Sequence, residues 1–298
     1  MIFYYALGGG LGHVTRAQAL IHTLGLDDPV TLAMTSAWDE SLLPIPDQFQ
    51  QVRAPQALSQ DPTGLRAWLE SLWSSERYRT IIIDAFPAGV LGELSGLSPL
   101  ADTQMIHCAR RLKWTRYAPL ITGKLPRYDA CYLLESLSGA HLSALRATCS
   151  ALRTLKLRDR PLERAVDSSG AHLAQHSGDT PRGIPLWLIV HAGSADELRE
   201  LTDFAIESAA LEGVRPRLLL ISPQRPDGIP AHVEHGRIYP AHPLFSRADR
   251  IFTACGFNTV RQLSDHRAKH RYQPFSRRFD DQHERAAALR SGEWDRFS

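Results

Sequence analysis

Near its N-terminus the chain reads Gly8-Gly9-Gly10-Leu11-Gly12-His13-Val14-Thr15-Arg16. The apolar run from Ile2 to Leu7 predicts a buried strand before it, and Ala17 to Leu24 predicts a helix after it. A strand, a glycine loop and a helix form the first turn of a doubly wound α/β domain, where backbone amides at the helix start favour anions. The third glycine of the dinucleotide fingerprint is replaced by His13. His13 is therefore a candidate for chemistry at a cleft, with capping or packing as the alternative.

The composition is that of an ordinary globular protein. The 298 residues are 43% hydrophobic and 22% charged, which is enough chain for two domains of ~150 residues. A formal net charge of +2 gives no argument for nucleic-acid binding. The N-terminus lacks a charged region typical of a signal peptide, and no apolar run approaches the ~20 residues of a membrane span. We expect a cytoplasmic protein, with peripheral association at the inner face of the membrane as the alternative.

The cysteines and acids give no indication of a metal site. Cys108, Cys131, Cys149 and Cys255 lie far apart without a CxxC pair, so we expect reduced thiols and neither a zinc site nor a disulfide framework. No Asp-x-Asp pair precedes a suitable strand, so we expect no metal. No cofactor is expected beyond a nucleotide-sugar substrate.

Strands and helices alternate through the first half of the chain. The clearest strand is Thr80-Ile81-Ile82-Ile83-Asp84-Ala85-Phe86, whose β-branched composition is typical of a parallel sheet covered on both faces. Asp84 stands near its carboxyl end, where ligands of open α/β sheets collect, so it is a candidate catalytic acid or base, with a loop or capping acid as the alternative. Further strands are predicted at 30–34, 51–54, 103–108 and 130–134, and a helix at 63–74.

A polar, glycine-rich stretch, 167–183, interrupts this alternation and is the predicted linker between domains 1–166 and 184–298. The alternation then resumes. Ser194 and Glu197 fit a capping box that begins a helix running to about Leu211. Strands are expected at 186–192, 217–222, 237–239, 250–254 and 271–275, and a helix from Asp280 to about Leu289. The predicted fold class is α/β, with two Rossmann-like doubly wound domains facing a central cleft.

At several places the sequence resembles GT-B glycosyltransferases of the MurG-like group, glycosyltransferase family 28, and more distantly the PseG-type nucleotide-sugar hydrolases. The loop from Gly8 to Arg16 resembles the acceptor-side loop of that group, which ends in a histidine. The segment 239–249 is similar to the one whose backbone holds the nucleobase, and 254–259 to the glycine turn that binds the diphosphate. Gly193-Ser194 partly matches a second phosphate loop, and Asp281-Gln282 resembles the pair that contacts the donor sugar.

The resemblance implies a role for each of these residues. His13 or Asp84 would be the catalytic base, and the acceptor loop would comprise Gly9, Gly10, Gly12 and Arg16. Asp281 and Gln282 would bind the donor sugar, although Asp281 equally suits a helix start. The donor nucleotide and phosphates would be bound by Gly193, Ser194, Tyr239, Leu244, Phe245, Gly256, Phe257, Asn258, Thr259 and Gln262.

Three of these assignments need a further comment. Ser194 and Asn258-Thr259 could act as helix N-caps as well as phosphate ligands. Gln262 stands where the family often has a glutamate for the ribose hydroxyls, and an amide binds hydroxyls more weakly than a carboxylate.

A basic run lies in the first half, with Trp114 and Tyr117 interleaved. It could bind an anionic acceptor or anionic lipid headgroups, and a solvated surface is the alternative. The run comprises Arg110, Arg111, Lys113, Arg116, Lys124 and Arg127.

The function expected from the resemblance is inverting, metal-independent transfer of a sugar from a nucleotide diphosphate sugar, UDP-linked, to the hydroxyl of an unknown acceptor. A PseG-type nucleotide-sugar hydrolase and a non-catalytic nucleotide-sugar-binding protein are the alternatives.

Overall fold

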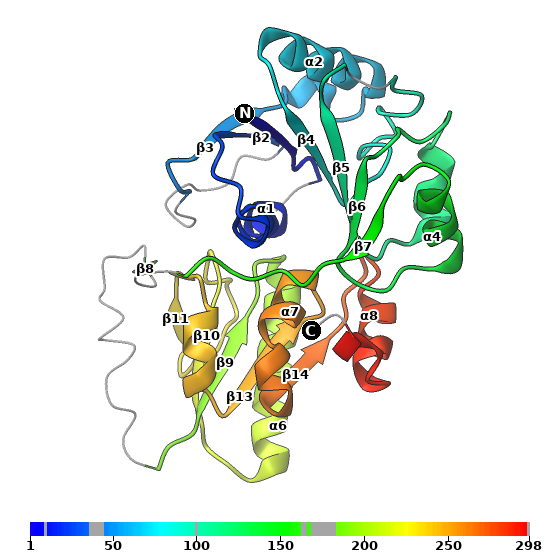
Figure 1. Ribbon diagram of the computed structural model, residues 1–298. Coiled ribbons are helices and arrows are strands. Elements are labelled where there is room, and N and C mark those ends of the chain that lie inside the picture. The colour runs from blue at the N-terminus through cyan, green and yellow to red at the C-terminus, as the bar shows by residue number, and fades with distance from the viewer. Residues whose placement is uncertain (9–10, 36–44, 99–100, 162–165, 168–182, 297–298) are drawn as a thin grey trace.

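The computed structural model describes residues 1–298 except 9–10, 36–44, 99–100, 162–165, 168–182 and 297–298. Gly9 and Gly10 of the predicted acceptor loop, and most of the predicted linker, therefore lie outside the described residues. The chain folds into two α/β halves, one above the other in Figure 1.

The first half is built on a seven-stranded parallel sheet in the order β3-β2-β1-β4-β5-β6-β7. β1 and β4 lie at its centre and are buried on both faces: Ile2 and Tyr4 belong to one core, Phe3 and Tyr5 to another. The period-two alternation of a strand separates these pairs, and helices cover both faces. The strands are β1 Ile2–Tyr5, β2 Val30–Met34, β3 Phe49–Arg53, β4 Thr80–Asp84, β5 Gln104–Ala109, β6 Ala130–Leu133 and β7 Leu152–Thr154.

One helix of this half begins directly after a capping aspartate that the sequence provides. The Asp61 side chain accepts a hydrogen bond from the Gly64 amide at 2.9 Å, which caps the helix that follows. Leu65 and Leu69 of that helix are buried at helical spacing. The helices are α1 Leu11–Leu24, α2 Pro62–Ser75, α3 Trp114–Tyr117 and α4 Gly139–Arg146, with 3-10 turns η2 Gln56–Leu58 and η3 Ala118–Leu120.

The second half has a five-stranded parallel sheet in the order β11-β10-β9-β13-β14. The predicted cap of its long helix is confirmed, because the Ser194 side chain accepts a hydrogen bond from the Glu197 amide. The strands are β9 Leu186–Val190, β10 Arg217–Ile221, β11 Glu234–Gly236, β13 Arg250–Ala254 and β14 His270–Gln273. The helices are α6 Ala195–Glu212, α7 Phe257–Gln262 and α8 Gln282–Arg290, with 3-10 turns η4 His242–Arg247, η5 Ser264–Lys269 and η6 Glu293–Arg296.

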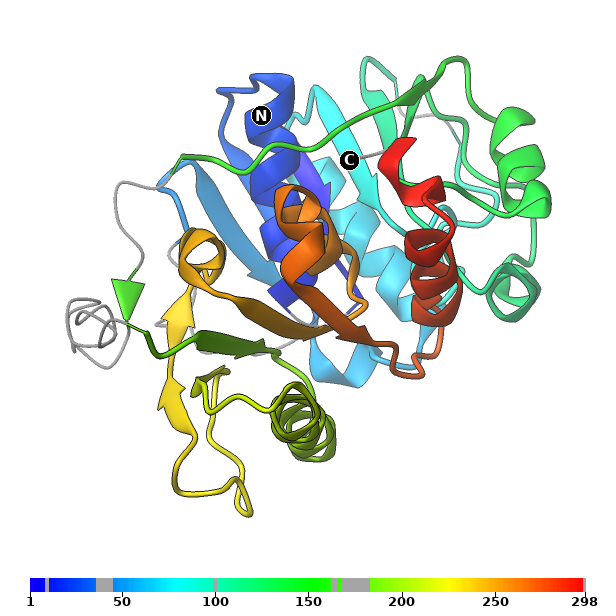
Figure 2. The same cartoon turned by 90° about the horizontal axis from the view of Figure 1, so that it is seen from below.

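The two halves share a hydrophobic core. Val14 and Ala17 of α1 lie in one cluster with Phe257 and Val260 of α7 and with Trp294 of η6. Figure 2 shows α7 beside α1, and Arg285 of α8 donates hydrogen bonds to Glu135, which closely follows β6 of the first half. Since α8 follows the last strand of the second half, the C-terminal part of the chain returns to the first half.

Three strands and one helix depart from the predicted pattern. The predicted strand 237–239 is reduced to β12 Ile238–Tyr239, which pairs antiparallel with β8 Val166–Asp167 outside the five-stranded sheet. β11, β7 and α4 were not predicted, because they are short and their sequences carry little apolar periodicity.

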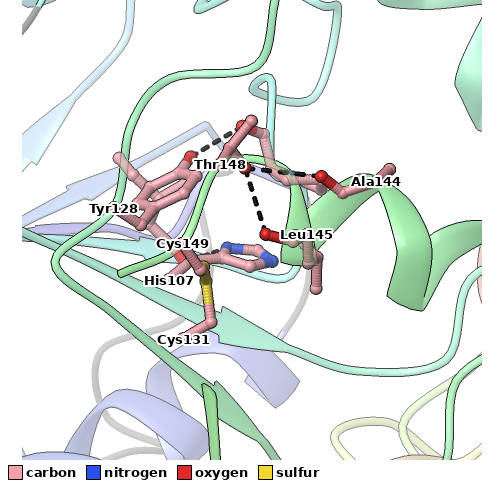
Figure 3. The surroundings of a disulfide bond; sticks show 9 residues. His107, Tyr128, Cys131, Ala144, Leu145, Thr148 and Cys149 are labelled. Carbon is pink, nitrogen blue, oxygen red and sulfur yellow. Dashed lines mark hydrogen bonds between the residues drawn. A yellow bond between two sulfur atoms is a disulfide. The ribbon is translucent and has the colours of Figure 1, made fainter. Parts of the chain in front are cut away.

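One expectation about the cysteines is wrong. Cys131 and Cys149 form a disulfide, with Cα atoms 6.2 Å apart, and Figure 3 shows it beside His107 and Tyr128. An isolated β-bridge between Tyr128 and Cys149 brings the loop before β7 next to β6. The two cysteines are 18 residues apart in the sequence, and that spacing alone does not reveal their proximity. Cys108 and Cys255 are free and buried. The cysteine pattern therefore gives no argument for a reducing compartment.

Candidate active site

The glycine loop and the clearest strand bring three charged or titratable side chains together. His13 and Arg16 lie on successive turns at the start of α1, and Asp84 ends β4, the strand beside β1. Asp84 Oδ2 lies 2.8 Å from His13 Nδ1 and accepts a 2.7 Å hydrogen bond from Arg16 Nη2, while Oδ1 accepts from Arg16 Nε at 2.6 Å. Both carboxylate oxygens are thus occupied, and all three side chains are buried.

The electrostatics of this cluster hold Asp84 charged and His13 neutral. Burial alone would raise the pKa of Asp84, but the charge of Arg16 and the hydrogen bonds from Arg16 and His13 outweigh it and hold the pKa below its usual range. Burial lowers the pKa of His13 more than Asp84 raises it. With Asp84 accepting from the Nδ1–H of a neutral imidazole, Nε2 carries the lone pair. His13 can therefore accept a proton through Nε2.

The backbone around the cluster leaves room for this ring. A Cβ added at Gly8 would lie 2.6 Å from His13 Nε2, so a side chain larger than hydrogen there would displace the imidazole. Directly after Asp84, the buried Ala85 has φ 68°, a left-handed conformation that costs an alanine about 1 kcal/mol. This turn places the Phe86 ring against His13, with centroids 6.1 Å apart.

His13 opens into a cleft of about 560 Å³ between the two halves. The wall of the cleft on the side of the first half is apolar and consists of Phe86, Val90 and Phe279. Asp84 does not line the cleft. The predicted residues that line this cleft are Gly12, His13, Arg16, Gly193, Gly256, Phe257, Asn258, Thr259 and Gln282.

A second, mainly apolar pocket of about 190 Å³ continues from the cleft, because Gly12, His191, Asn258 and Thr259 line both. The predicted nucleotide residues that line this pocket are Tyr239, Phe245, Asn258, Thr259 and Gln262. Leu244, which was also predicted to bind the nucleotide, does not line this pocket and packs in the adjoining core instead. The edge strand β11 does not line the pocket either.

Polar contacts join the halves at this pocket. Asn258 Nδ2 donates to the Gly12 carbonyl at 2.7 Å, and Thr15 Oγ1 lies 3.0 Å from Tyr239 Oη. The Arg16 guanidinium lies over the Phe257 ring, 5.8 Å from its centroid. The glycine loop of the first half and the turn 256–259 of the second half are therefore in direct contact.

A further charged group lies where α6 begins. His191 Nε2 is 2.8 Å from Glu197 Oε2, and Arg277 Nη2 donates to the same oxygen at 2.7 Å. Glu197 thus does not complete the predicted capping box through its side chain. A Cβ at Gly193 would collide with both His191 and Glu197, so glycine is needed for this approach. The end of the cleft near α6 carries an arginine, a histidine and the exposed amide of Gly193.

The predicted donor-sugar pair is split by the structure. Asp281 is the N-cap of α8 and accepts from the Glu284 amide at 3.3 Å. Gln282 lines the cleft, and its Oε1 accepts from the Phe275 amide at 3.0 Å. Asp280, which was not among the candidates, lines the cleft.

Asp280 belongs to a buried ionic network between the halves. Arg285 of α8 donates to both oxygens of Glu135 at 2.8 Å and to Asp280 at 2.8 Å, and Arg110 donates to Asp280 at 2.5 Å. Both Arg285 and Glu135 have no exposed surface. Arg110 was predicted only as part of the basic run. His191 was not predicted as a site residue, although it stands near the end of the predicted strand 186–192, at the edge where ligands collect.

Comparisons with known proteins bear on the fold. No protein-family model matches the chain, and no curated protein matches it. A UDP-glucosyltransferase from Polygonum tinctorium that can glucosylate indoxyl has a similar structure, with a TM-score of 0.59, 14% identity, and 98% of this chain and 83% of that chain covered. The glycotransferase of kitacinnamycin gives 0.58, 16%, 97% and 84%. WaaG, a glycosyltransferase of lipopolysaccharide biosynthesis, gives 0.53, 13%, 98% and 90%.

These similarities extend over nearly the whole chain at low identity. Together with two parallel sheets facing one cleft, they confirm the predicted fold class: the chain has the two-domain, Rossmann-like GT-B fold.

Proposed function

We propose that this protein is a glycosyltransferase that moves a sugar from a nucleoside diphosphate sugar, UDP-linked, to an acceptor hydroxyl, with inversion and without a metal ion. The observation that carries the proposal is the neutral His13, held by a buried Asp84 at the cleft of a GT-B fold. The similar UDP-glucosyltransferase supports the class of donor.

In the proposed reaction, His13 Nε2 takes the proton of the acceptor hydroxyl as its oxygen attacks the anomeric carbon. The bond from that carbon to the diphosphate breaks, and the nucleoside diphosphate leaves with the electron pair. Asp84 is the residue that orients the imidazole and stabilises its protonated form, because both of its oxygens are already bonded and it does not line the cleft.

The leaving diphosphate needs positive partners. Gly193, which directly precedes the N-cap of the 18-residue helix α6, lines the cleft with Arg277, so a backbone amide, a helix dipole and a guanidinium are available there. Among the described residues, no group of three or more His, Cys, Asp or Glu is arranged to hold a metal ion. We propose that the Gly193 amide, the dipole of α6 and the Arg277 guanidinium stabilise the negative charge of the departing diphosphate.

The acceptor side is apolar. Phe86, Val90 and Phe279 lie in the cleft with His13, and such a wall suits an acceptor with an apolar or aromatic face. Membership of the MurG-like group within the GT-B fold is part of this proposal and rests on the loop from Gly8 to Arg16 and on Asn258-Thr259.

Membrane association is a separate part of the proposal. Among the described helices, none has the length and apolarity that a membrane crossing requires. Arg110, Arg111 and Lys113 contact residues of the α8 region, so Arg116, Lys124 and Arg127 remain as the exposed cations for anionic lipids. Salt-sensitive binding to phosphatidylglycerol vesicles would support peripheral association, and no binding at low salt would exclude it.

The proposal is tested by nucleotide binding and by sugar turnover. A thermal-shift screen should show stabilisation by one nucleoside diphosphate, UDP being expected, because a ligand of the native state raises the melting temperature. UDP release from UDP-sugars should then require added phenolic or sugar acceptors. Fast release without acceptor would instead identify a nucleotide-sugar hydrolase, and binding without turnover on any donor a non-catalytic protein.

A further inference from the structure

The apolar pocket has one uncharged polar side chain at the end of α7. Gln262 lines this pocket beside Thr259, and its side chain is half-buried. Its amide carries both a donor and an acceptor, so its orientation decides which kind of ligand group it can bind.

A residue of the other half fixes that orientation. Gln262 Nε2 donates to Asp159 Oδ2 at 3.2 Å. Asp159 lies in the segment that leaves β7, and its carboxylate also accepts from Arg261 at 2.6 and 3.0 Å. Arg261 is 8% exposed and donates to the Leu157 carbonyl as well, so the carboxylate is held at two points.

The charge of Asp159 excludes the opposite orientation of the amide. A carboxylate only accepts hydrogen bonds, so turning the amide would set its oxygen against Asp159 and repel it. With Nε2 used in this way, Gln262 Oε1 makes no hydrogen bond within the described part of the chain. The side chain therefore turns its amide oxygen away from Asp159 and presents it as an acceptor to whatever enters the pocket.

We infer that Asp159 is a positioning residue that fixes Gln262 as a hydrogen-bond acceptor for a ligand hydroxyl, so that the pocket selects ribonucleotides over 2′-deoxyribonucleotides. The inference rests on the proposed function, which puts a nucleoside diphosphate in the cleft. A ribose hydroxyl is the donor that such an acceptor requires, and a 2′-deoxy ligand has one hydroxyl fewer to offer.

This arrangement also links selectivity to the contact between the halves. Asp159 belongs to the connection from the first half, whereas Arg261 and Gln262 belong to α7. The acceptor is correctly oriented only while the connection lies against α7. A glutamate at this position would present an acceptor oxygen in either orientation. The Gln262 amide does so only because Asp159 fixes its orientation.

The test is the ratio of dissociation constants for UDP and 2′-deoxy-UDP, measured by calorimetry on the full chain. If thermal shift favours another base, ADP, GDP or CDP and its 2′-deoxy counterpart replace them. Wild type should prefer the ribonucleotide by about three- to tenfold, which is the net worth of one hydrogen bond. Asp159→Ala, which leaves the amide free to turn, should bring the ratio close to one.

Exchanging the carboxylate of Asp159 with the amide of Gln262 gives a rescue experiment. Gln262→Glu sets two carboxylates against each other and should weaken binding of both nucleotides. Adding Asp159→Asn restores a donor beside the introduced carboxylate, so the double variant should regain both affinity and the ratio. A double variant no better than Gln262→Glu alone would overturn the inference.

Arg261→Met is the matched control. It removes the same ion pair from Asp159 but leaves the carboxylate that Gln262 Nε2 donates to, so the melting temperature should fall while the ratio falls less than in Asp159→Ala. An unchanged ratio in Asp159→Ala, with normal UDP binding, overturns this inference alone. A wild-type protein that binds no nucleoside diphosphate overturns the proposed function, and this inference with it.

Discussion

At the scale of single residues, the candidate site divides its work between a buried ion pair and a neutral base. Asp84 and Arg16 are bonded to each other at 2.6 and 2.7 Å, so both charges are already paired. His13 completes the cluster through Nδ1 and leaves Nε2 for chemistry. Proton transfer by one such group contributes typically 10²- to 10⁴-fold to a rate, roughly.

Replacing His13 by alanine should therefore lower turnover by about 10²- to 10⁴-fold. Nucleotide affinity should stay that of wild type, because His13 lines the cleft but not the apolar pocket. His22→Ala, an exposed histidine of the same helix, is the control and should leave both quantities unchanged. Turnover that survives His13→Ala would remove His13 from the mechanism.

The pH profile follows from the same residue. Burial lowers the pKa of His13 from 6.5, so the imidazole is neutral at pH 7 and becomes protonated only below its ordinary range. Because the protonated form cannot accept a proton, kcat/KM should be level near pH 7 and fall as the pH drops, with a midpoint below 6.5. Initial rates from pH 5 to pH 8 measure it, and an acid limb centred above 6.5 would contradict a buried neutral base.

At the scale of elements, two helix starts allow capping to be separated from ligand binding. Asp61 caps α2 and Ser194 caps α6, each through a side-chain oxygen that accepts from a backbone amide three residues on. Of these two helices, only α6 starts next to a residue that lines the cleft, Gly193.

We expect Asp61→Ala and Ser194→Ala each to lower the free energy of unfolding by about 1 kcal/mol, as the loss of an N-cap does. Urea denaturation measures this loss. If Ser194 also binds phosphate, its variant alone should weaken UDP affinity. Equal UDP affinity in the two variants would leave Ser194 as a cap only.

The helix α8 gives a larger effect, because Arg285 joins it to Glu135 of the first half with no exposure of either side chain. Arg285→Met leaves a buried carboxylate without its partner and should cost about 3–5 kcal/mol of unfolding free energy. Arg290→Met, on the exposed end of the same helix, should cost less than about 0.5 kcal/mol. Similar losses in chemical denaturation of both variants would show that the network does not hold α8.

At the scale of the whole molecule, much of the α/β pattern could be predicted from the sequence. The strand 30–34 was predicted with the bounds of β2, and 80–86 contains β4, because long β-branched runs leave little choice of structure. The loop with His13 and the strand with Asp84 were both recognised, and the parallel pairing of β1 with β4 explains why they meet.

Contacts between distant segments were beyond the sequence. The pairing of Cys131 with Cys149, and of Arg285 with Glu135 across 150 positions, depends on how elements fold back on one another. Asp280 and Asp281 differ by one position, yet one lines the cleft and the other caps a helix. A helix turns about 100° per residue, so an error of one residue at a helix start changes which side chain faces the site.

The core that Val14, Val260 and Trp294 share has a thermodynamic consequence. Separating the halves would expose this apolar surface to water, which costs a free energy of about 25 cal/mol for each Å² exposed. We therefore expect the two halves to unfold together, as one cooperative unit, in spite of the two separate sheets. Heat should be absorbed in a single peak, and two separate peaks would show that the halves unfold independently.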